Sequence, residues 1–555
     1  MRKKGSSLGC LSLILLLLIA CAAGIYAWKR YGPTKEPADL DELYQVRAED
    51  EVTVFLNYEM QEARGIYEEG QTYLPIDWVN KNLNERFYWD NNEALLVYAL
   101  PDEILTAPEG TKGPGGRRLF IRRGEDVLLS LGLVLNYTDI RVNAYDSGKQ
   151  KRVFIQDTWD EVPVAVISKN SRVRVKGGVK SPVITNAVKG EDVIVLETME
   201  RWFKVLTRDG HIGYMPGSRL TDLKAEKPVS SFKAPVYQNI SLDEKITLVW
   251  HQVTLEAANA VLEELLAQTK GINVIAPTWF TLSDNEGNYE SLADKSYVEK
   301  AHEKGIQVWA VVDNFSRECS KNVRSEVLLS KTSVRKRLIE NLMKEADTYG
   351  FDGINLDFES LKEEAGVHYI EFIRELSVSC RRKGLVLSVD NYVPAGYNYF
   401  YNRREQGIVA DYVIIMGYDE HYAGGEAGSV ASIGYVEDGI RNTLELVPRE
   451  KVINAVPFYT RLWTQSGEKL SSKAMGISAA KKWIEEQGAQ LQWNEELGQY
   501  YTQAETEDGE SMLWMEDSRS LKLKMDVIKK EDLAGVACWK LGLEPQEIWD
   551  VIGWE

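Results

Sequence analysis

Asn355, Asp357 and Glu359 lie two residues apart in an otherwise apolar segment. On a β-strand, residues at this spacing share one face and stand roughly 6.6 Å apart along the chain. The intervening residues are apolar, so we expect their face to meet helices and the polar face to point into the protein. Burying two carboxylates is costly unless they are paired or used, and no Lys or Arg lies on that face. The pattern favours acid chemistry over a satisfied internal network, with Glu359 as proton donor and Asp357 one step deeper.

Eight apolar runs, separated by helical patterns, indicate the scaffold that holds this segment. Leu338, Leu342 and Ala346 recur at helical spacing before Gly350, and Ile370 opens a second such stripe that ends near residue 384. Eight strand–helix units predict an α/β fold, the TIM (β/α)8 barrel, whose active sites lie at the carboxyl ends of the strands. The runs begin at Ile246, Val274, Gln307, Gly353, Leu385, Tyr412, Val452 and Gly535.

The interval between the seventh and eighth runs is much longer than the others. We expect residues 465–530 to form a small α+β insertion. Loops that follow barrel strands open on the catalytic face, so this insertion should wall the active site.

Three motifs in the barrel resemble one known family. Asp352-Gly-Ile-Asn-Leu-Asp-Phe-Glu359 resembles the DGxDxDxE signature of glycoside hydrolase family 18, and Met416-Gly-Tyr-Asp419 resembles that family's MxYD motif. Trp539 matches the Trp that floors the catalytic sugar subsite. The resemblance covers residues 240–555 and implies substrate-assisted, retaining cleavage of a glycosidic bond.

The resemblance also implies a role for each motif residue. Glu359 would protonate the glycosidic oxygen, while the substrate's 2-acetamido oxygen attacks the anomeric carbon. Asp357 would orient that acetamide and stabilise the oxazolinium-like intermediate, Tyr418 would donate a hydrogen bond to it, and Asp419 would contact the sugar. Further substrate-binding candidates are Asn355, Met416, Trp539, Tyr459 and Tyr392. Trp250, Trp279 and Trp309 are candidates for stacking on sugars, although at least half of these barrel aromatics should serve packing.

Two positions depart from the family pattern. Asn355 replaces the middle Asp of the motif. We expect its amide to hydrogen-bond Asp357, but a neutral amide cannot raise the pKa of Asp357 by like-charge repulsion. The pH optimum should therefore be shifted. The SxGG motif is absent, and Val311–Phe315 stands in its place. With the segment Pro457–Trp463, these features resemble the bacterial branch that cleaves peptidoglycan of the spore cortex or cell wall.

Two other functions remain open. The same residues would suit a chitinase or an endo-N-acetylglucosaminidase, and family members without the acid serve as non-catalytic carbohydrate-binding proteins, against which the retained Glu359 argues. The net charge of −18 argues against nucleic acid as a partner. With five His and neither a CxxC nor an HExxH motif, we expect no metal and no cofactor. We expect a monomer whose partner is an N-acetylated polysaccharide.

The first thirty residues indicate export. Arg2, Lys3 and Lys4 precede the uncharged run Gly5–Trp28, which exceeds the roughly 20 residues that cross a bilayer. We expect a single-pass membrane anchor with the catalytic domain outside the cytoplasm. The alternatives are a cleaved signal peptide, hence secretion, and a lipid anchor at Cys21, because residues 18–21 resemble a lipobox.

Two small modules should separate the anchor from the barrel. Residues 40–160 predict an α+β module, and residues 73–90 resemble the N-terminal stalk of copper amine oxidases. Residues 163–223 read as short strands of a small all-β barrel, and Trp202–Tyr214 resembles the bacterial SH3-like domain. A linker at 224–238 follows, and we expect the barrel to fold and act without residues 1–235.

Overall fold

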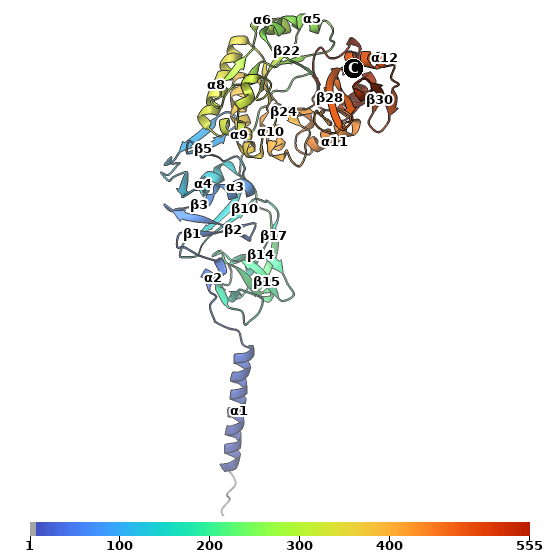
Figure 1. Ribbon diagram of the computed structural model, residues 1–555. Helices are drawn as coiled ribbons and strands as arrows, with labels where there is room; N and C mark the ends of the chain where they lie inside the picture. Colours follow the sequence, from blue (N-terminus) through green and yellow to red (C-terminus); the bar gives the residue numbers. More distant parts are fainter. Residues whose placement is uncertain (1–6, 555) are drawn as a thin grey trace, which may run out of the picture. The chain divides into compact units, whose positions relative to one another are not determined.

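The structure, a computed structural model, describes residues 7–554, with side chains from residue 12 on, and it divides into two compact units (Figure 1). One unit comprises Met1–Phe87 and Pro108–Ala234. The other comprises Tyr88–Ala107 and Pro235–Glu555.

The second unit is built on a closed barrel of eight parallel strands. Adjacent strands pair in the order β19-β18-β32-β26-β25-β24-β23-β22, and β19 pairs with β22 to close the ring. The TIM-barrel prediction is therefore confirmed. The strands are β18 (Ile246–His251), β19 (Val274–Pro277), β22 (Gln307–Asp313), β23 (Gly353–Asp357), β24 (Val386–Tyr392), β25 (Tyr412–Met416), β26 (Val452–Pro457) and β32 (Gly535–Trp539).

Helices cover the outside of this barrel. The two predicted helical stripes belong to α8 (Thr332–Tyr349) and α9 (Glu363–Lys383), and both helices end at glycines with positive φ, Gly350 at 79° and Gly384 at 71°. A left-handed residue at this position favours glycine, which has no Cβ to clash. The other helices are α5 (Leu262–Leu266), α6 (Lys295–Glu303), α7 (Ser325–Leu328), α10 (Arg403–Val409), α11 (Ile433–Leu444) and α13 (Ser518–Lys530).

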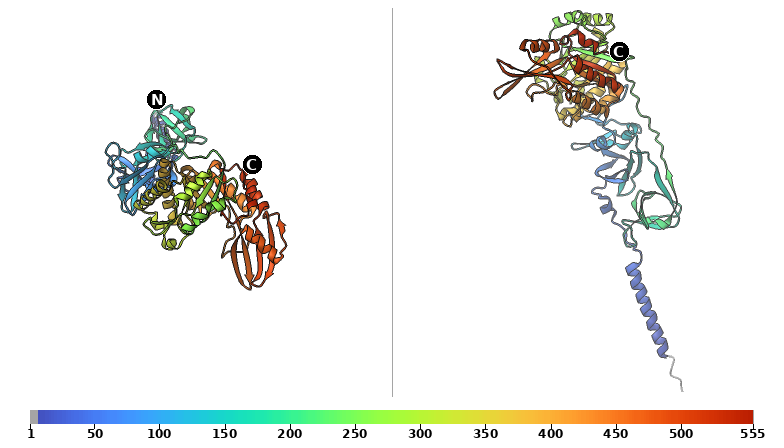
Figure 2. Two further views of the ribbon diagram at one scale, coloured as in Figure 1. Left: turned by 90° about the horizontal axis from the view of Figure 1, so that it is seen from above. Right: turned by 90° about the vertical axis from the view of Figure 1, so that its right-hand side faces the viewer.

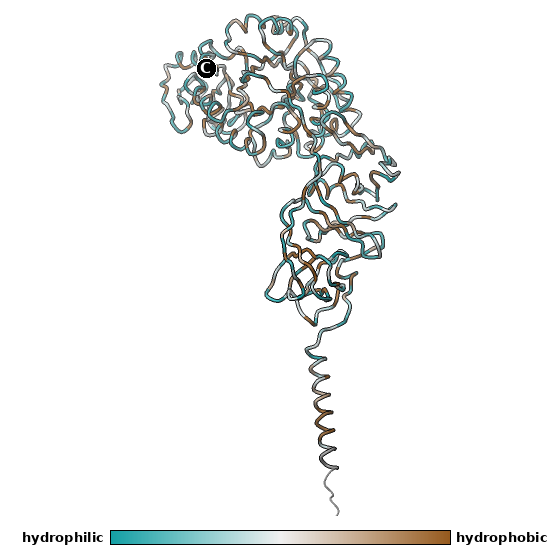
Figure 3. The backbone as a smooth tube through the Cα atoms, turned by 180° about the vertical axis from the view of Figure 1, so that it is seen from behind, coloured by the Kyte–Doolittle hydropathy of each residue, from teal (hydrophilic) through white to brown (hydrophobic). Residues whose placement is uncertain are grey.

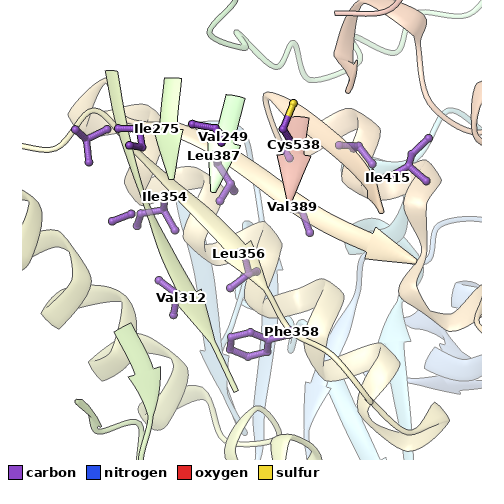
Figure 4. Close-up of a cluster of buried hydrophobic side chains, with 14 of the residues drawn as sticks. Val249, Ile275, Val312, Ile354, Leu356, Phe358, Leu387, Val389, Ile415 and Cys538 are labelled. Atoms are coloured by element: carbon purple, nitrogen blue, oxygen red, sulfur yellow. The ribbon is translucent and has the colours of Figure 1, made fainter. Parts of the chain in front are cut away.

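Two apolar layers hold the barrel together. Ile354, Leu356 and Phe358 belong to the larger cluster, which lies between the strands and the helices (Figure 4). A second cluster, which includes Trp309 and Tyr412 stacked at 5.5 Å, fills the inside of the barrel. The apolar side chains of β23 thus face the helices, and its polar side chains face the barrel interior.

The insertion between β26 and β32 is a five-stranded antiparallel sheet with one helix, which extends from the barrel in the left view of Figure 2. It begins at Tyr459 and its last strand ends at Met515, so its bounds differ from the expected 465–530. Helix α13 packs against α11, β26 and β32 as a barrel helix. The elements are β27 (Tyr459–Ser466), β28 (Lys469–Gly476), α12 (Ile477–Gln487), β29 (Gln492–Asn494), β30 (Gln499–Thr506) and β31 (Gly509–Met515).

The first unit contains two seven-stranded sheets. The SH3-like region has the order β13-β12-β16-β15-β14-β11-β17, and its last strand runs into the expected linker. Its strands are β11 (Val162–Ile167), β12 (Ser171–Arg174), β13 (Val183–Ala187), β14 (Asp192–Thr198), β15 (Trp202–Leu206), β16 (Ile212–Pro216) and β17 (Leu220–Glu226).

The sheet that precedes it has the order β7-β8-β3-β2-β1-β10-β9. Three short helices accompany this sheet. Its elements are α2 (Leu40–Tyr44), β1 (Glu51–Leu56), β2 (Glu59–Glu68), β3 (Gln71–Pro75), α3 (Ile76–Asn82), β7 (Phe120–Arg123), β8 (Asp126–Ser130), α4 (Leu131–Tyr137), β9 (Arg141–Tyr145) and β10 (Lys151–Gln156).

The chain begins with one long apolar helix, α1 (Ser7–Tyr31), whose span Ser12–Tyr31 has a mean hydropathy of 1.9 and no buried share (Figure 3). By length and composition this helix is suited to a signal sequence or a membrane anchor. Arg2, Lys3 and Lys4, on which the predicted orientation rests, lie outside the described residues.

The segment Tyr88–Ala107 belongs to the second unit, although the sequence places it inside the N-terminal module. It forms a three-stranded sheet of β4 (Tyr88–Asp90), β5 (Leu95–Ala99) and β6 (Ile104–Pro108). Helix α8 has no capping side chain of its own at Lys331. Asp90 instead accepts hydrogen bonds from the backbone nitrogen (2.6 Å) and the hydroxyl (2.7 Å) of Thr332. The barrel therefore uses a helix cap from residues 1–235, the part of the chain without which we expect it to fold.

We predict that Asp90→Ala lowers the free energy of unfolding of the second unit by about 1–2 kcal/mol, because α8 loses its N-terminal cap. Chemical denaturation of the purified chain measures this change. Asp102→Ala, an exposed position in the same segment, is the matched control and should leave stability unchanged. Equal stability of the two variants would contradict the capping role.

Candidate active site

The carboxyl end of β23 carries the residues that the sequence singles out. Asn355 is 0% exposed and Asp357 is 8% exposed, and both face the barrel interior. Oδ1 of Asp357 is buried and has no hydrogen-bond partner among the described residues. Glu359 follows just beyond the strand and is partly exposed. The strand therefore presents a buried carboxyl group with a more accessible one above it.

Glu359 is held in place by groups from two neighbouring strands. Its backbone nitrogen donates to Oδ1 of Asn314 (2.9 Å), and the amide of Asn314 donates back to its carbonyl oxygen (3.0 Å). The hydroxyl of Tyr392 donates to Oε2 of Glu359 at 2.8 Å. Asn314 lies in the segment that stands in place of the missing SxGG motif, so that segment positions the acid.

The environment of Glu359 suits a proton donor. Burial raises the pKa of Glu359 above its ordinary value, the hydrogen bond from Tyr392 lowers it, and the nearby charges of Asp419 and Asp313 raise it further. A raised pKa keeps a carboxyl group protonated closer to neutral pH, as a general acid requires.

Asn355 does not hydrogen-bond Asp357, so this expectation is wrong. Its Oδ1 accepts from the indole nitrogen of Trp250 (2.8 Å), and its Nδ2 donates to Ser388 Oγ (3.0 Å) and to Oδ1 of Asp390 (2.8 Å). Both amide hydrogens are used within the barrel. Asn355 is buried and hydrogen-bonded to other protein side chains, whereas the sequence predicts that it contacts substrate.

Asp390 is a site residue that the motif analysis missed. It is 2% exposed on β24, the strand next to β23. Burial raises the pKa of Asp357 well above its ordinary value, and the charge of Asp390 is the next largest cause. Asn355 adds no repulsion of its own, but like-charge repulsion acts on Asp357 from a second carboxyl group on the neighbouring strand. The sequence did carry a sign of this residue, because Ser388, Asp390 and Tyr392 alternate with period two and so share one face of their strand.

The motif after β25 adds a hydroxyl group and a carboxylate. Tyr418 is partly exposed, and burial raises its pKa well above the ordinary value, so its hydroxyl stays protonated. A Cβ at Gly417 would approach the carbonyl oxygen of Ala455 to 2.8 Å, so this turn requires glycine. The hydroxyl of Tyr459 donates to Asp419 at 2.5 Å, which joins the insertion to the motif. Met416 is 7% exposed on the interior of β25.

The aromatic candidates divide by exposure. Trp539 is partly exposed at the end of β32, with its ring 5.9 Å from that of Trp250. Trp250, Trp279 and Trp309 are at most 2% exposed and pack in the barrel, so they do not offer faces to a sugar. Within residues 7–554, no group of three or more His, Cys, Asp or Glu side chains is arranged to hold a metal ion.

Two family models match the chain. Residues 280–544 match the glycosyl hydrolases family 18 model, and residues 169–221 match the bacterial SH3 domain model. The resemblance of residues 73–90 to the copper amine oxidase stalk stays a prediction.

The curated relatives include two proteins of Bacillus subtilis. The chain is 27% identical to the uncharacterized glycosylase YvbX of Bacillus subtilis (strain 168) over 293 residues, 51% of this chain and 84% of that protein. It is 27% identical to the cortical fragment-lytic enzyme of the same organism over 248 residues, 43% of this chain and 58% of that protein. The chain therefore spans little more than half of the latter relative.

Among solved structures, the chitinase from Chromobacterium violaceum ATCC 12472 has a similar fold. It superposes with a TM-score of 0.51 at 24% identity and covers 56% of this chain and 98% of its own.

We predict that Tyr392→Phe raises the pKa of Glu359 by about one unit, because the lost hydrogen bond favours the charged carboxylate. An acid must be protonated to act, so the alkaline limb of a pH–rate profile on an N-acetylglucosamine oligomer should move to higher pH. Tyr289→Phe removes a hydroxyl that donates to Glu345 elsewhere in this unit and is the matched control. An unmoved alkaline limb in Tyr392→Phe would show that this bond does not tune Glu359.

Proposed function

This chain carries a glycosyl hydrolase family 18 domain, and from that premise we propose that it is an exported glycosidase that cleaves β-1,4 bonds next to N-acetylglucosamine in peptidoglycan. The observation that carries the proposal is the arrangement of Glu359, with its raised pKa and its hydrogen bond from Tyr392, above the buried Asp357.

In the first step Glu359 gives its proton to the glycosidic oxygen as the bond to the anomeric carbon breaks. The substrate's own 2-acetamido oxygen attacks that carbon and forms an oxazolinium-like intermediate, so no second carboxylate is needed as nucleophile. In the second step water attacks the anomeric carbon, and the Glu359 carboxylate takes up the proton of that water.

Asp357 and Tyr418 act on the acetamide group. Asp357 lies deeper in the barrel, where it accepts a hydrogen bond from the acetamide N–H and so orients the acetamide and stabilises the intermediate. Such stabilisation is strong because the site is buried and its groups are already in place. The hydroxyl of Tyr418 remains protonated and donates to the same group. Asp419, Tyr459 and the partly exposed face of Trp539 surround the sugar.

Three observations favour peptidoglycan over chitin as the polymer. A curated relative is named a cortical fragment-lytic enzyme. The chain also carries a bacterial SH3 domain, which suits retention on the wall. The segment Val311–Phe315 supplies Asn314 to hold Glu359, in place of the SxGG motif found in chitinases.

We further propose that α1 remains as a membrane anchor with the glycosidase on the outer side. The helix continues without a break from Ser7 past Cys21 to Tyr31, which is long enough to cross a bilayer.

We predict that Glu359→Gln lowers turnover by about two orders of magnitude or more, because glutamine cannot donate the proton. Asp357→Asn should also cost about 3–4 kcal/mol in transition-state stabilisation. Release of reducing ends from purified peptidoglycan, spore cortex and chitin measures both effects and ranks the polymers. De-N-acetylated peptidoglycan should resist the wild-type protein, because it lacks the internal nucleophile.

Glu364→Gln, an exposed position on α9, is the matched control and should keep full activity. Full hydrolysis by Glu359→Gln, or equal cleavage of the de-N-acetylated polymer, would contradict substrate-assisted catalysis. Faster cleavage of chitin than of peptidoglycan would instead favour the chitinase function.

We predict that the mature protein keeps its N-terminus and partitions with the cytoplasmic membrane, because α1 is apolar and has no buried face. Membrane fractionation followed by N-terminal sequencing tests this. A mature chain that begins after residue 21 would indicate a cleaved signal peptide, and a lipid on Cys21 would indicate a lipoprotein.

A further inference from the structure

Asp357 and Asp390 face the barrel interior from adjacent parallel strands. The register of β23 and β24 pairs Asn355 with Ser388 and Leu356 with Val389, so Asp357 and Asp390 come next on their strands. Neighbouring strands lie roughly 4.8 Å apart, and side chains at equivalent positions point the same way. Two carboxyl groups with 8% and 2% exposure are therefore neighbours in one buried layer.

The two carboxyl groups differ in their hydrogen bonds. Oδ1 of Asp390 accepts a hydrogen bond from Asn355, and Trp250 and Ser388 fix the orientation of that amide. Oδ1 of Asp357 is buried with no partner within the described chain. A donated hydrogen bond stabilises a carboxylate, whereas an unpartnered buried oxygen favours the neutral form. The negative charge thus belongs on Asp390 and the proton on Asp357.

We propose that Asp390 is a positioning residue that keeps Asp357 protonated through the reaction, with Asn355 as the hydrogen-bond donor that holds the charge on Asp390. This inference rests on the proposed glycosidase function. When Glu359 loses its proton to the leaving group, a protonated Asp357 next to it avoids two adjacent negative charges. Its carbonyl oxygen remains free to accept from the acetamide N–H, and the charge of Asp390 behind it offsets the charge of the oxazolinium.

The electrostatics of the layer agree with this assignment. Burial raises the pKa of both carboxyl groups well above the ordinary value, and the hydrogen bond from Asn355 acts in the opposite direction on Asp390 alone. Among the neighbouring charges, that of Asp390 raises the pKa of Asp357 the most. The titratable groups that face the pair are Glu359 just after β23, Asp313 on β22, Tyr418 after β25, Tyr369 on α9 and Tyr401 before α10.

Asp390→Asn is the first test, because asparagine keeps the shape and can still accept from Asn355. Without the repulsion of Asp390, Asp357 should ionise at lower pH, and the alkaline limb of the pH–rate profile should move down by about one unit. Turnover at pH 7 should fall at least about tenfold, with a smaller loss at acid pH where Asp357 regains its proton. KM should stay within about twofold, because Asp390 is buried away from substrate.

The second test returns the carboxyl group to β23. In the double variant Asn355→Asp/Asp390→Asn, the amide and the carboxyl group exchange places across the hydrogen bond that joins them. Turnover should recover to within about threefold of the wild-type rate, although Asp390→Asn alone is impaired. A double variant no better than Asp390→Asn, or an unmoved pH profile in Asp390→Asn, would overturn the proposal.

A third readout does not depend on hydrolysis. A carboxyl group whose pKa is raised on folding stabilises the fold when protonated, so stability falls as pH rises from the unfolded value of 3.8 through the raised value. Asp390→Asn removes one such group, so the stability of the variant should fall less as pH rises. Its Tm at pH 8 should therefore be higher than that of the wild-type protein by about 2 °C or more. A variant that fails to fold, or that unfolds earlier at pH 8, would overturn the proposal.

Asp411→Asn is the matched control. Asp411 is a buried carboxylate that accepts from the backbone nitrogens of Ile240 (2.7 Å) and Leu387 (2.8 Å) near the other end of β24. This variant should unfold at lower temperature and keep the wild-type pH profile. If the wild-type protein cleaves no N-acetylated glycan, the proposed function fails, while the stability comparison still decides whether Asp390 and Asp357 share one proton.

Discussion

The centre of the catalytic unit holds carboxyl groups in a buried layer that supplies no cation. Asp357 and Asp390 are almost fully buried, and Glu359 stands above them. Removing charged groups from water is expensive, and the protein resolves the cost by raising the pKa of each of these groups. Acid chemistry follows from this constraint, because a raised pKa keeps a carboxyl group protonated closer to neutral pH, where it can donate a proton or a hydrogen bond.

Elsewhere in this unit, buried charges have direct partners. Arg335 pairs with Glu375 at 2.7 Å, and Lys524 pairs with Glu516 at 2.9 Å. The first pair joins α8 to α9, the second joins α13 to the segment just before it, and each charge is satisfied locally. The layer around Asp357 contrasts with them, since it concentrates like charges where a structural role would require opposite ones. That contrast locates the functional site without reference to any motif.

The parts of the unit far from the site serve to keep this layer rigid. Apolar side chains fill the barrel below it and the space between strands and helices outside it. Asn314 fixes the backbone of Glu359, and Trp250 fixes the amide of Asn355. The insertion reaches the site through Tyr459 and Asp419. Even the distant Asp90 contributes, because it caps the helix that precedes β23.

The sequence alone determined the features that depend on local periodicity. Period-two alternation placed Asn355 and Asp357 on one face of a strand, with Glu359 just beyond its end, and eight apolar runs identified the barrel. The spacing of apolar residues likewise located α8 and α9, because a helix repeats over a few residues.

The tertiary structure decided which distant residues meet. Asn355 hydrogen-bonds Asp390 rather than Asp357. This contact depends on the register of two neighbouring strands, which pairs Asn355 with Ser388, 33 residues later in the chain. The cap of α8 comes from Asp90, 242 residues before Thr332. Strand alternation fixes only the face on which a side chain lies. Which groups lie beside it, and therefore its hydrogen bonds and its pKa, is set by how the strands and helices pack together.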